Sequence, residues 1–141
     1  MEKTKQNLDI MINDKIEIIK WEPDFTNFPN TIYIASLIDD YEGFRVIVKS
    51  ENSSEHFKFK FNNYISYRNA DEGARLKSLN LFPLNSRQWC LFRAEKSDFI
   101  SWIVEESSGM YLEEAITHYF FVTPNDIIEV LSLEEPELEE L

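Results

Sequence analysis

A strict alternation of polar and apolar side chains over residues 56–62 is the feature that most constrains the fold of this chain. Every second residue from Phe57 to Phe61 is a phenylalanine, and the residues between them are lysines. Successive side chains of a β-strand point to opposite faces, so the pattern predicts an antiparallel strand with one buried and one solvated face. The phase continues to Tyr67. Residues 62–63 are therefore interpreted as a bend in one strand, with a two-residue hairpin as the open alternative.

The same period of two marks further strands, separated by short polar links. Predicted strands cover residues 31–38, 44–49, 89–93 and 116–122. Alternation over residues 10–20 indicates a strand pair or one bulged strand. Residues 21–30 contain two prolines and three aromatic side chains, which predicts a loop folded back on the core.

Three segments carry helix signals. Asn69 followed by Glu72 matches a capping box and predicts a short helix that ends near residue 79. Ser97 is the predicted cap of a second helix, which ends near Gly109. Residues 123–126 place a cap residue, a proline and a carboxylate in the order of a helix start, so a third helix is predicted after them.

These elements predict an α+β fold, in which an antiparallel sheet of about five or six strands carries two or three short helices. A length of 141 residues fits a single domain. Residues 1–133 are predicted to form that domain. Residues 134–141 hold five carboxylates and a proline, and are predicted to be a solvated acidic tail.

Charge is distributed unevenly along the chain. Residues 1–94 hold as many acidic as basic side chains, whereas residues 95–141 hold 13 acidic side chains and one lysine, so the net charge of -12 belongs to the last third. Such a surface repels phosphate backbones, and no apolar run approaches the roughly 20 residues of a membrane helix. With one cysteine and no apolar leader, we expect a soluble, cytoplasmic protein that binds neither nucleic acid nor membranes.

The usual signatures of catalysis and cofactor binding are missing from the sequence. One cysteine and two distant histidines do not make a zinc site, and the three glycines stand apart rather than in a phosphate-binding loop. Cys90 is interpreted as a small buried hydrophobe and His118 as a core histidine. We therefore expect no catalytic residue, no metal and no cofactor.

Two groups of residues are candidates for partner binding. The first is Tyr67, Arg68 and Glu72, where a predicted strand ends and a helix begins. Tyrosine and arginine are enriched at interface hot spots. Helix capping and an ion pair between Glu72 and Arg75 would explain the same residues without a partner.

The second group comprises two adjacent pairs of glutamates in the acidic third, Glu105 with Glu106 and Glu113 with Glu114. Side chains of adjacent residues diverge on a helix or a strand, so neither pair predicts a metal site or an acid–base couple. As part of an acidic surface they are candidates to contact a basic partner.

Residues 65–72 (ISYRNADE) and 116–132 (ITHYFFVTPNDIIEVLS) resemble segments of small uncharacterised bacterial domains, some of which are similar to toxin-neutralising immunity proteins. The resemblance implies an intracellular protein that binds a toxin domain and has no catalytic residues. The leading hypothesis is a non-enzymatic protein-binding module of the immunity type, whose acidic C-terminal third binds a basic partner. The alternative is a small-ligand-binding or enzymatic domain with a pocket lined by His118 and Tyr119.

Overall fold

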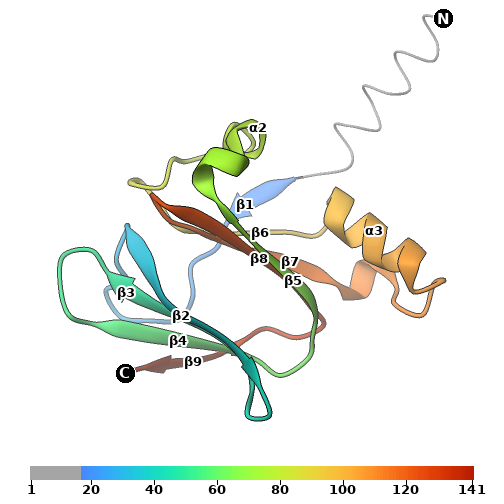
Figure 1. Cartoon of the computed structure of the whole chain (residues 1–141), viewed down its shortest axis with the longest axis horizontal. Helices are drawn as coiled ribbons and strands as arrows, with labels where there is room; N and C mark the ends of the chain where they lie inside the picture. The colour runs from blue at the N-terminus through green and yellow to red at the C-terminus, as the bar shows by residue number, and fades with distance from the viewer. Residues whose placement is uncertain (1–16) are drawn as a thin grey trace, which may run out of the picture.

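Two antiparallel β-sheets stack face to face in the computed structural model, which describes residues 17–141 (Figure 1). The strands are β1 (Ile18–Lys20), β2 (Ile32–Asp40), β3 (Gly43–Ser50), β4 (His56–Phe61), β5 (Tyr64–Asp71), β6 (Leu91–Ala94), β7 (Thr117–Val122), β8 (Asp126–Ser132) and β9 (Glu137–Glu140). The helices are α2 (Leu76–Leu79) and α3 (Asp98–Glu106), with short 3₁₀ turns η1 (Glu72–Ala74) and η2 (Glu113–Ala115). The predicted α+β class is confirmed, and its strands are shared between two sheets.

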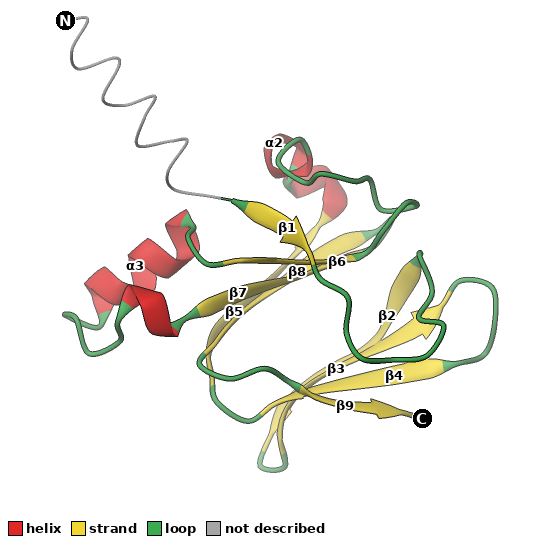
Figure 2. Ribbon diagram, turned by 180° about the vertical axis from the view of Figure 1, so that it is seen from behind, coloured by secondary structure: helices red, strands yellow, loops and turns green. Residues whose placement is uncertain are grey.

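The order of strands gives the two sheets different surroundings. Sheet A has five strands in the order β1-β6-β7-β8-β5, and sheet B has four in the order β2-β3-β4-β9. Figure 2 shows α2 and α3 on the side of sheet A that faces away from sheet B. We call the face of sheet A that meets sheet B its inner face, and the face toward the helices its outer face.

The chain crosses between the sheets at Asn62 and Asn63. β4 pairs with β3 and β9 in sheet B, whereas β5 pairs with β8 in sheet A. The chain does change direction at these residues, but it forms two strands in different sheets rather than the predicted single bent strand, and the two strands do not pair as a hairpin either.

Aromatic rings fill the space between the sheets. Phe57, Phe59 and Phe61 are buried, as the alternation predicts. The ring of Phe59 lies 5.0 Å from that of Phe121 on β7, centroid to centroid. Trp21 closes one side of this core with its ring 5.6 Å from Phe59, so the loop after β1 does fold back on the core.

The helix predicted after residues 123–126 is wrong, because residues 126–132 form strand β8 between β7 and β5. The hydroxyl of Thr123 accepts the backbone N–H groups of Asn125 and Asp126, each at 3.0 Å. These bonds are chemically the same as those of a helix cap, but here they close the turn of a hairpin. β8 is buried on both faces and rich in β-branched residues, which is typical of a central strand.

The acidic end of the chain is also not a solvated tail, because Glu137–Glu140 form strand β9 at the edge of sheet B. Leu138 lies opposite Phe59 and packs against the core. On the outer side, Lys58 lies opposite Glu139 and pairs with it at 2.7 Å. The basic side of β4 therefore supplies the counter-charges that let an acidic segment form a strand.

Helix starts are predicted with mixed success. Ser97 caps α3 as predicted, accepting the backbone N–H of Ile100 at 3.1 Å. The other predicted cap is wrong, because Asn69 lies inside β5 and Asp71 accepts the N–H of Gly73 instead. Of the strand pair predicted over residues 10–20, the part up to residue 16 lies outside the described residues, and residues 18–20 form β1.

Candidate functional site

A buried carboxylate lies on the outer face of sheet A. Glu129 is on β8, opposite Arg68 of β5 and Phe120 of β7. Its side chain is only 1% exposed, which is rare for a carboxylate unless partners compensate its charge. Alternation along β8 explains the placement, because the flanking Ile128 and Val130 belong to the core between the sheets.

Three side chains from separate elements hold this carboxylate. Arg68 donates two parallel hydrogen bonds, from Nε at 2.7 Å and from Nη2 at 2.8 Å. Arg75, between η1 and α2, donates to Oε2 of Glu129 and to the hydroxyl of Ser78. Nε2 of His118 on β7 lies 3.0 Å from Oε1. The network therefore joins β5, β7, β8 and the segment that carries α2.

His118 connects the carboxylate to helix α3. Its Nδ1 lies 2.7 Å from the hydroxyl of Ser97, the residue that caps α3. A carboxylate only accepts hydrogen bonds, so Nε2 donates to Glu129, and Nδ1 accepts from Ser97. Every polar atom in this chain of bonds has a partner, which fixes the N-terminus of α3 against sheet A.

Burial and hydrogen bonding set the charges in the network. Burial alone would raise the pKa of Glu129, but hydrogen bonds from His118, Arg68 and Arg75 outweigh it and hold that pKa well below its usual range. Burial lowers the pKa of His118, and the hydrogen bond to Glu129 opposes this only in part. The site therefore holds an ionised carboxylate, two guanidinium groups and a neutral imidazole.

Ser97, His118 and Glu129 stand in the order of a hydrolytic triad, but their surroundings do not suit that chemistry. A triad needs a hydroxyl that substrate can reach and an imidazole that becomes cationic in the transition state. Ser97 and His118 are 2% and 1% exposed, and the cavity beside them measures about 100 Å³. Arg68 and Arg75 also lower the pKa of His118.

The pocket required by an enzymatic or ligand-binding function is accordingly small, since ligand pockets usually measure about 300–1,000 Å³. Tyr119, expected to line that pocket with His118, faces the opposite side of sheet A, with its ring 4.9 Å from that of Trp21.

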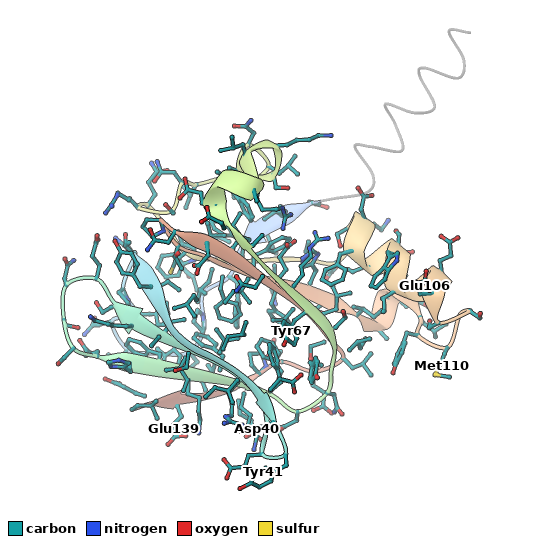
Figure 3. All side chains as sticks on the ribbon, viewed as in Figure 1. Asp40, Tyr41, Tyr67, Glu106, Met110 and Glu139 are labelled. Carbon is teal, nitrogen blue, oxygen red and sulfur yellow. The ribbon has the colours of Figure 1, made fainter. Side chains whose placement is uncertain are left out.

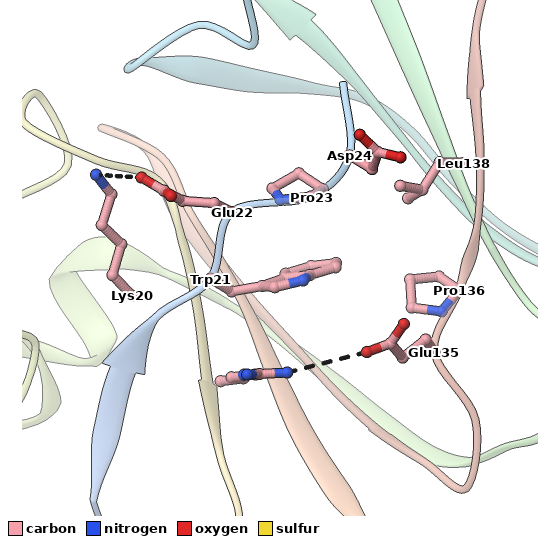
Figure 4. A pocket seen from close by; sticks show the side chains of 9 residues that line it. Lys20, Trp21, Glu22, Pro23, Asp24, Glu135, Pro136 and Leu138 are labelled. Atoms are coloured by element: carbon pink, nitrogen blue, oxygen red, sulfur yellow. Dashed lines mark ion pairs between the residues drawn. The ribbon is translucent and has the colours of Figure 1, made fainter. Parts of the chain in front are cut away.

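A larger hollow of about 540 Å³ lies between the segment after β1 and the segment before β9 (Figure 4). Lys20 pairs with Glu22 at 2.8 Å, and Arg93 pairs with Glu135 at 3.9 Å. These side chains neutralise each other at a wet surface, where ion pairs contribute little. Asp24 adds a third carboxylate to the lining, so the hollow carries one acidic charge beyond these two pairs, which is too little to select a ligand.

A groove of about 500 Å³ between β5 and α3 brings together two residues of the predicted partner site. Tyr67 and Arg68 line its β5 side, and Trp102 of α3, which is 50% exposed, lines the other. The guanidinium of Arg68 lies 4.4 Å from the ring centroid of Phe99, which also lines the groove. A large exposed aromatic side chain beside a groove is typical of a binding surface.

Two glutamates of the predicted partner site lie close to Trp102 on α3. Glu105 and Glu106 follow Trp102 by three and four residues on α3, so they lie on the same side of the helix, and both are exposed. The exposed Met110 and Leu112 lie in the turn that follows the helix, four and six residues after Glu106, and Figure 3 shows Glu106 and Met110 at one end of the molecule. We call these five residues the α3 surface.

The remaining predicted residues lie elsewhere. Glu113 and Glu114, on η2, line a separate hollow of about 270 Å³ with Glu95. Glu72 is half-buried on η1, where its backbone N–H donates to the carbonyl of Asn125 at 2.9 Å. The expected ion pair between Glu72 and Arg75 is replaced by the pair between Arg75 and Glu129.

Sequence reasoning missed Glu129 and Trp102. The wrong prediction of a helix hid Glu129, because a glutamate on the solvent side of a helix is ordinary. A lone carboxylate within an apolar strand would instead have indicated a buried ion pair. The exposure of Trp102 could have been predicted from the sequence. The apolar residues of the predicted helix share one face, and this tryptophan lies on the opposite face.

Other chemistry is sparse in the part of the chain that the structure describes. No group of three or more His, Cys, Asp or Glu side chains there could hold a metal ion. Cys90 is fully buried, and burial raises the pKa of its thiol, which disfavours the reactive thiolate. No helix within residues 17–141 has the length and apolar character to cross a membrane.

Comparison of the chain with protein-family models, curated proteins and solved structures finds no match.

Proposed function

We propose that this protein is a non-enzymatic protein-binding module of the immunity type, and that the α3 surface and the groove beside it contact a basic partner protein. The observation that carries the proposal is the exposed ring of Trp102, which lies beside a groove and is followed by two exposed glutamates on the same side of α3. Aromatic anchors surrounded by polar groups dominate the energy of many protein interfaces.

The distribution of charge favours a basic partner. The α3 surface belongs to the part of the chain with 13 acidic side chains and one lysine. One of these carboxylates, Glu129, is neutralised inside the protein, whereas Glu105 and Glu106 are exposed to solvent. Complementary charge raises the rate of association and suppresses partners of the wrong sign.

The resemblance to immunity-protein domains supports the more specific proposal that the partner is a toxin domain. Its two segments, residues 65–72 and 116–132, are distant in sequence but supply the neighbouring strands β5, β7 and β8. The resemblance therefore covers one connected part of sheet A. This part includes Arg68 at the edge of the groove.

Affinity capture from the native cell tests the proposal with two matched double variants. Trp102→Ala with Glu106→Lys changes the α3 surface, and Tyr41→Ala with Glu42→Lys makes the same chemical change at the tip of the β2–β3 hairpin. Tyr41 is 95% exposed and lies far from Glu106 (Figure 3).

A basic protein should be captured by wild type and by the hairpin variant, and lost with the α3 variant. Co-expression of the chain should then relieve any growth inhibition that the captured protein causes. Equal capture by all three forms, or no captured protein, would contradict the proposed function.

A further inference from the structure

The groove beside α3 runs along an open strand edge. β5 is at the end of sheet A and, among the described residues, pairs with β8 alone. Its residues Ser66, Tyr67 and Arg68 all line the groove. Side chains of consecutive strand residues alternate between faces, so a groove that all three line follows the edge of the strand.

The edge of β5 is better suited to accept another strand than most edges in this molecule. β1 has three residues and β9 has four, of which three are glutamates, and short or charged edges resist pairing. β5 has eight residues, and its register with β8 is regular from Ser66 to Asp71. β2 is longer, with nine residues, but a bulge near Ala35 interrupts its middle, whereas the irregularity in β5 lies near its start, between Tyr64 and Ser66.

The wall opposite this edge determines which side chains an added strand would carry. Trp102 offers an exposed ring face, and Glu105 and Glu106 place carboxylates one turn further along α3. A guanidinium or ammonium group near a tryptophan ring gains a cation–π attraction, which nearby carboxylates reinforce. Arg68 and Arg75 share the single carboxylate of Glu129, so this end of the groove keeps a net positive charge, and a cation of the added strand is favoured at Trp102 and the glutamates instead.

We propose that an extended basic segment of the partner adds as a strand to the open edge of β5 and places arginine or lysine side chains against Trp102, Glu105 and Glu106. This inference rests on the proposed function, and specifies how the partner binds. Main-chain hydrogen bonds to β5 supply affinity, and alternate side chains of the added strand supply specificity.

The probe is a synthetic peptide of alternating arginine and valine residues. It has eight residues, the length of β5. The peptide is titrated into the isotope-labelled full chain, and the NMR signals of the backbone amides and tryptophan indoles are followed. The signals of the β5 amides and of the Trp102 indole should shift. The same peptide with glutamate in place of arginine is the charge control. The variant with Trp102→Ala and Glu106→Lys should weaken binding at least about tenfold, whereas Tyr41→Ala with Glu42→Lys should leave it unchanged.

Backbone methylation separates strand addition from binding by side chains alone. In an added strand, every second peptide amide points toward β5. Methylating one alternate set of amides should abolish the shifts, and methylating the other set should preserve them. Equal binding by both methylated peptides, equal binding by the acidic peptide, shifts confined to other strands, or no shifts up to about 1 mM peptide would each overturn the inference.

A negative result in the peptide experiment and a negative result in the capture experiment reject different proposals. A partner that is captured only when the α3 surface is intact, combined with a peptide that does not engage β5, would retain the proposed function and reject strand addition. A peptide that engages β5, with no partner captured from the cell, would reject the proposed function.

Discussion

His118 and Tyr119 are neighbours on β7 that point to opposite faces of sheet A, and their surroundings differ as much as their directions. Tyr119 packs with its ring 5.4 Å from Phe61 on the inner face, where burial raises its pKa to about 12. His118 lies among Ser97 and Glu129 on the outer face, where burial lowers its pKa. The inner face is held by aromatic packing, whereas the outer face adds a hydrogen-bonded charge network to aromatic contacts such as that of His118 with Phe120, whose rings are stacked 3.9 Å apart.

The contrast indicates a division of tasks between the two faces. Aromatic packing is non-directional and contributes stability in proportion to the area buried. The outer network is directional, and it fixes α3 and the segment of α2 at defined positions on the sheet. Because α3 carries the proposed binding surface, we expect the network to orient that surface, and we expect the inner face to supply most of the stability.

Removing a ring that packs against the inner face of sheet A is the strongest way to test this division. Phe59→Ala should lower the free energy of unfolding by about 3 to 5 kcal/mol, because the side chain is fully buried between the sheets. Urea denaturation followed by tryptophan fluorescence measures the change. Lys58→Ala, on the outer side of the same strand, should cost less than about 1 kcal/mol. Similar losses for both would refute the assigned alternation.

Removing charge from the outer network should have the next largest effect. Glu129→Gln leaves the guanidinium groups of Arg68 and Arg75 without their carboxylate, and should lower the free energy of unfolding by about 2 to 3 kcal/mol. Glu105→Gln, at an exposed site on α3, should stay within about 0.5 kcal/mol. A Glu129→Gln protein as stable as wild type would show that the network contributes orientation without stability.

Acid should weaken the outer face before the inner one. The pKa of His118 is lowered in the folded protein from an ordinary value of 6.5, so below that pH the unfolded chain takes up a proton that the folded chain does not. Stability should therefore fall from pH 7 to pH 5, by at most about 1.4 kcal/mol per pH unit from this group. The depressed pKa of Glu129 extends the loss to lower pH, beginning below its ordinary value of 4.5.

His118→Gln should flatten the pH dependence of the free energy of unfolding between pH 7 and pH 5. Urea titrations at several pH values measure the slope. Equal slopes for wild type and His118→Gln would show that His118 is not buried as a neutral imidazole.

The smallest expected effect concerns the α3 surface itself. Trp102→Ala should change the free energy of unfolding by no more than about 0.5 kcal/mol, because half of its side chain is exposed. Phe99→Ala on the same helix should cost several times more, since Phe99 packs with Ile100 and Ile116 under α3. A large loss for Trp102→Ala in thermal unfolding would assign the tryptophan to structure and weaken its proposed role in binding.

Sequence periodicity predicts the residues of the core between the two sheets far better than those of the outer face of sheet A. The phenylalanines of β4 alternate so regularly that their burial follows from strand geometry alone. The sequence predicts a helix in place of β8, because its turn uses the hydrogen bonds of a helix cap and its two buried faces remove the alternation. The ion pairs of Glu129 with Arg68 and Arg75 join residues far apart in the chain, which no local pattern reveals.

The candidate site was only partly predictable for a similar reason. Tyr67 and Arg68 were identified from residue type, and Glu105 and Glu106 from charge. That β5 and α3 share a groove depends on how the helix lies across the sheet. This arrangement is tertiary and has no signal in the spacing of residues.

The crossing at Asn62 and Asn63 has a consequence for how fast the protein folds. Consecutive strands β4 and β5 find their partners in β9 and β8, near the other end of the chain, so neither sheet can be completed from local contacts. Closing such long loops costs entropy before the new contacts repay it, and chains with this topology typically fold in milliseconds to seconds. Until the last third of the chain docks, the long edges of β4 and β5 stay open together, and this interval is when the nascent protein is most prone to aggregate.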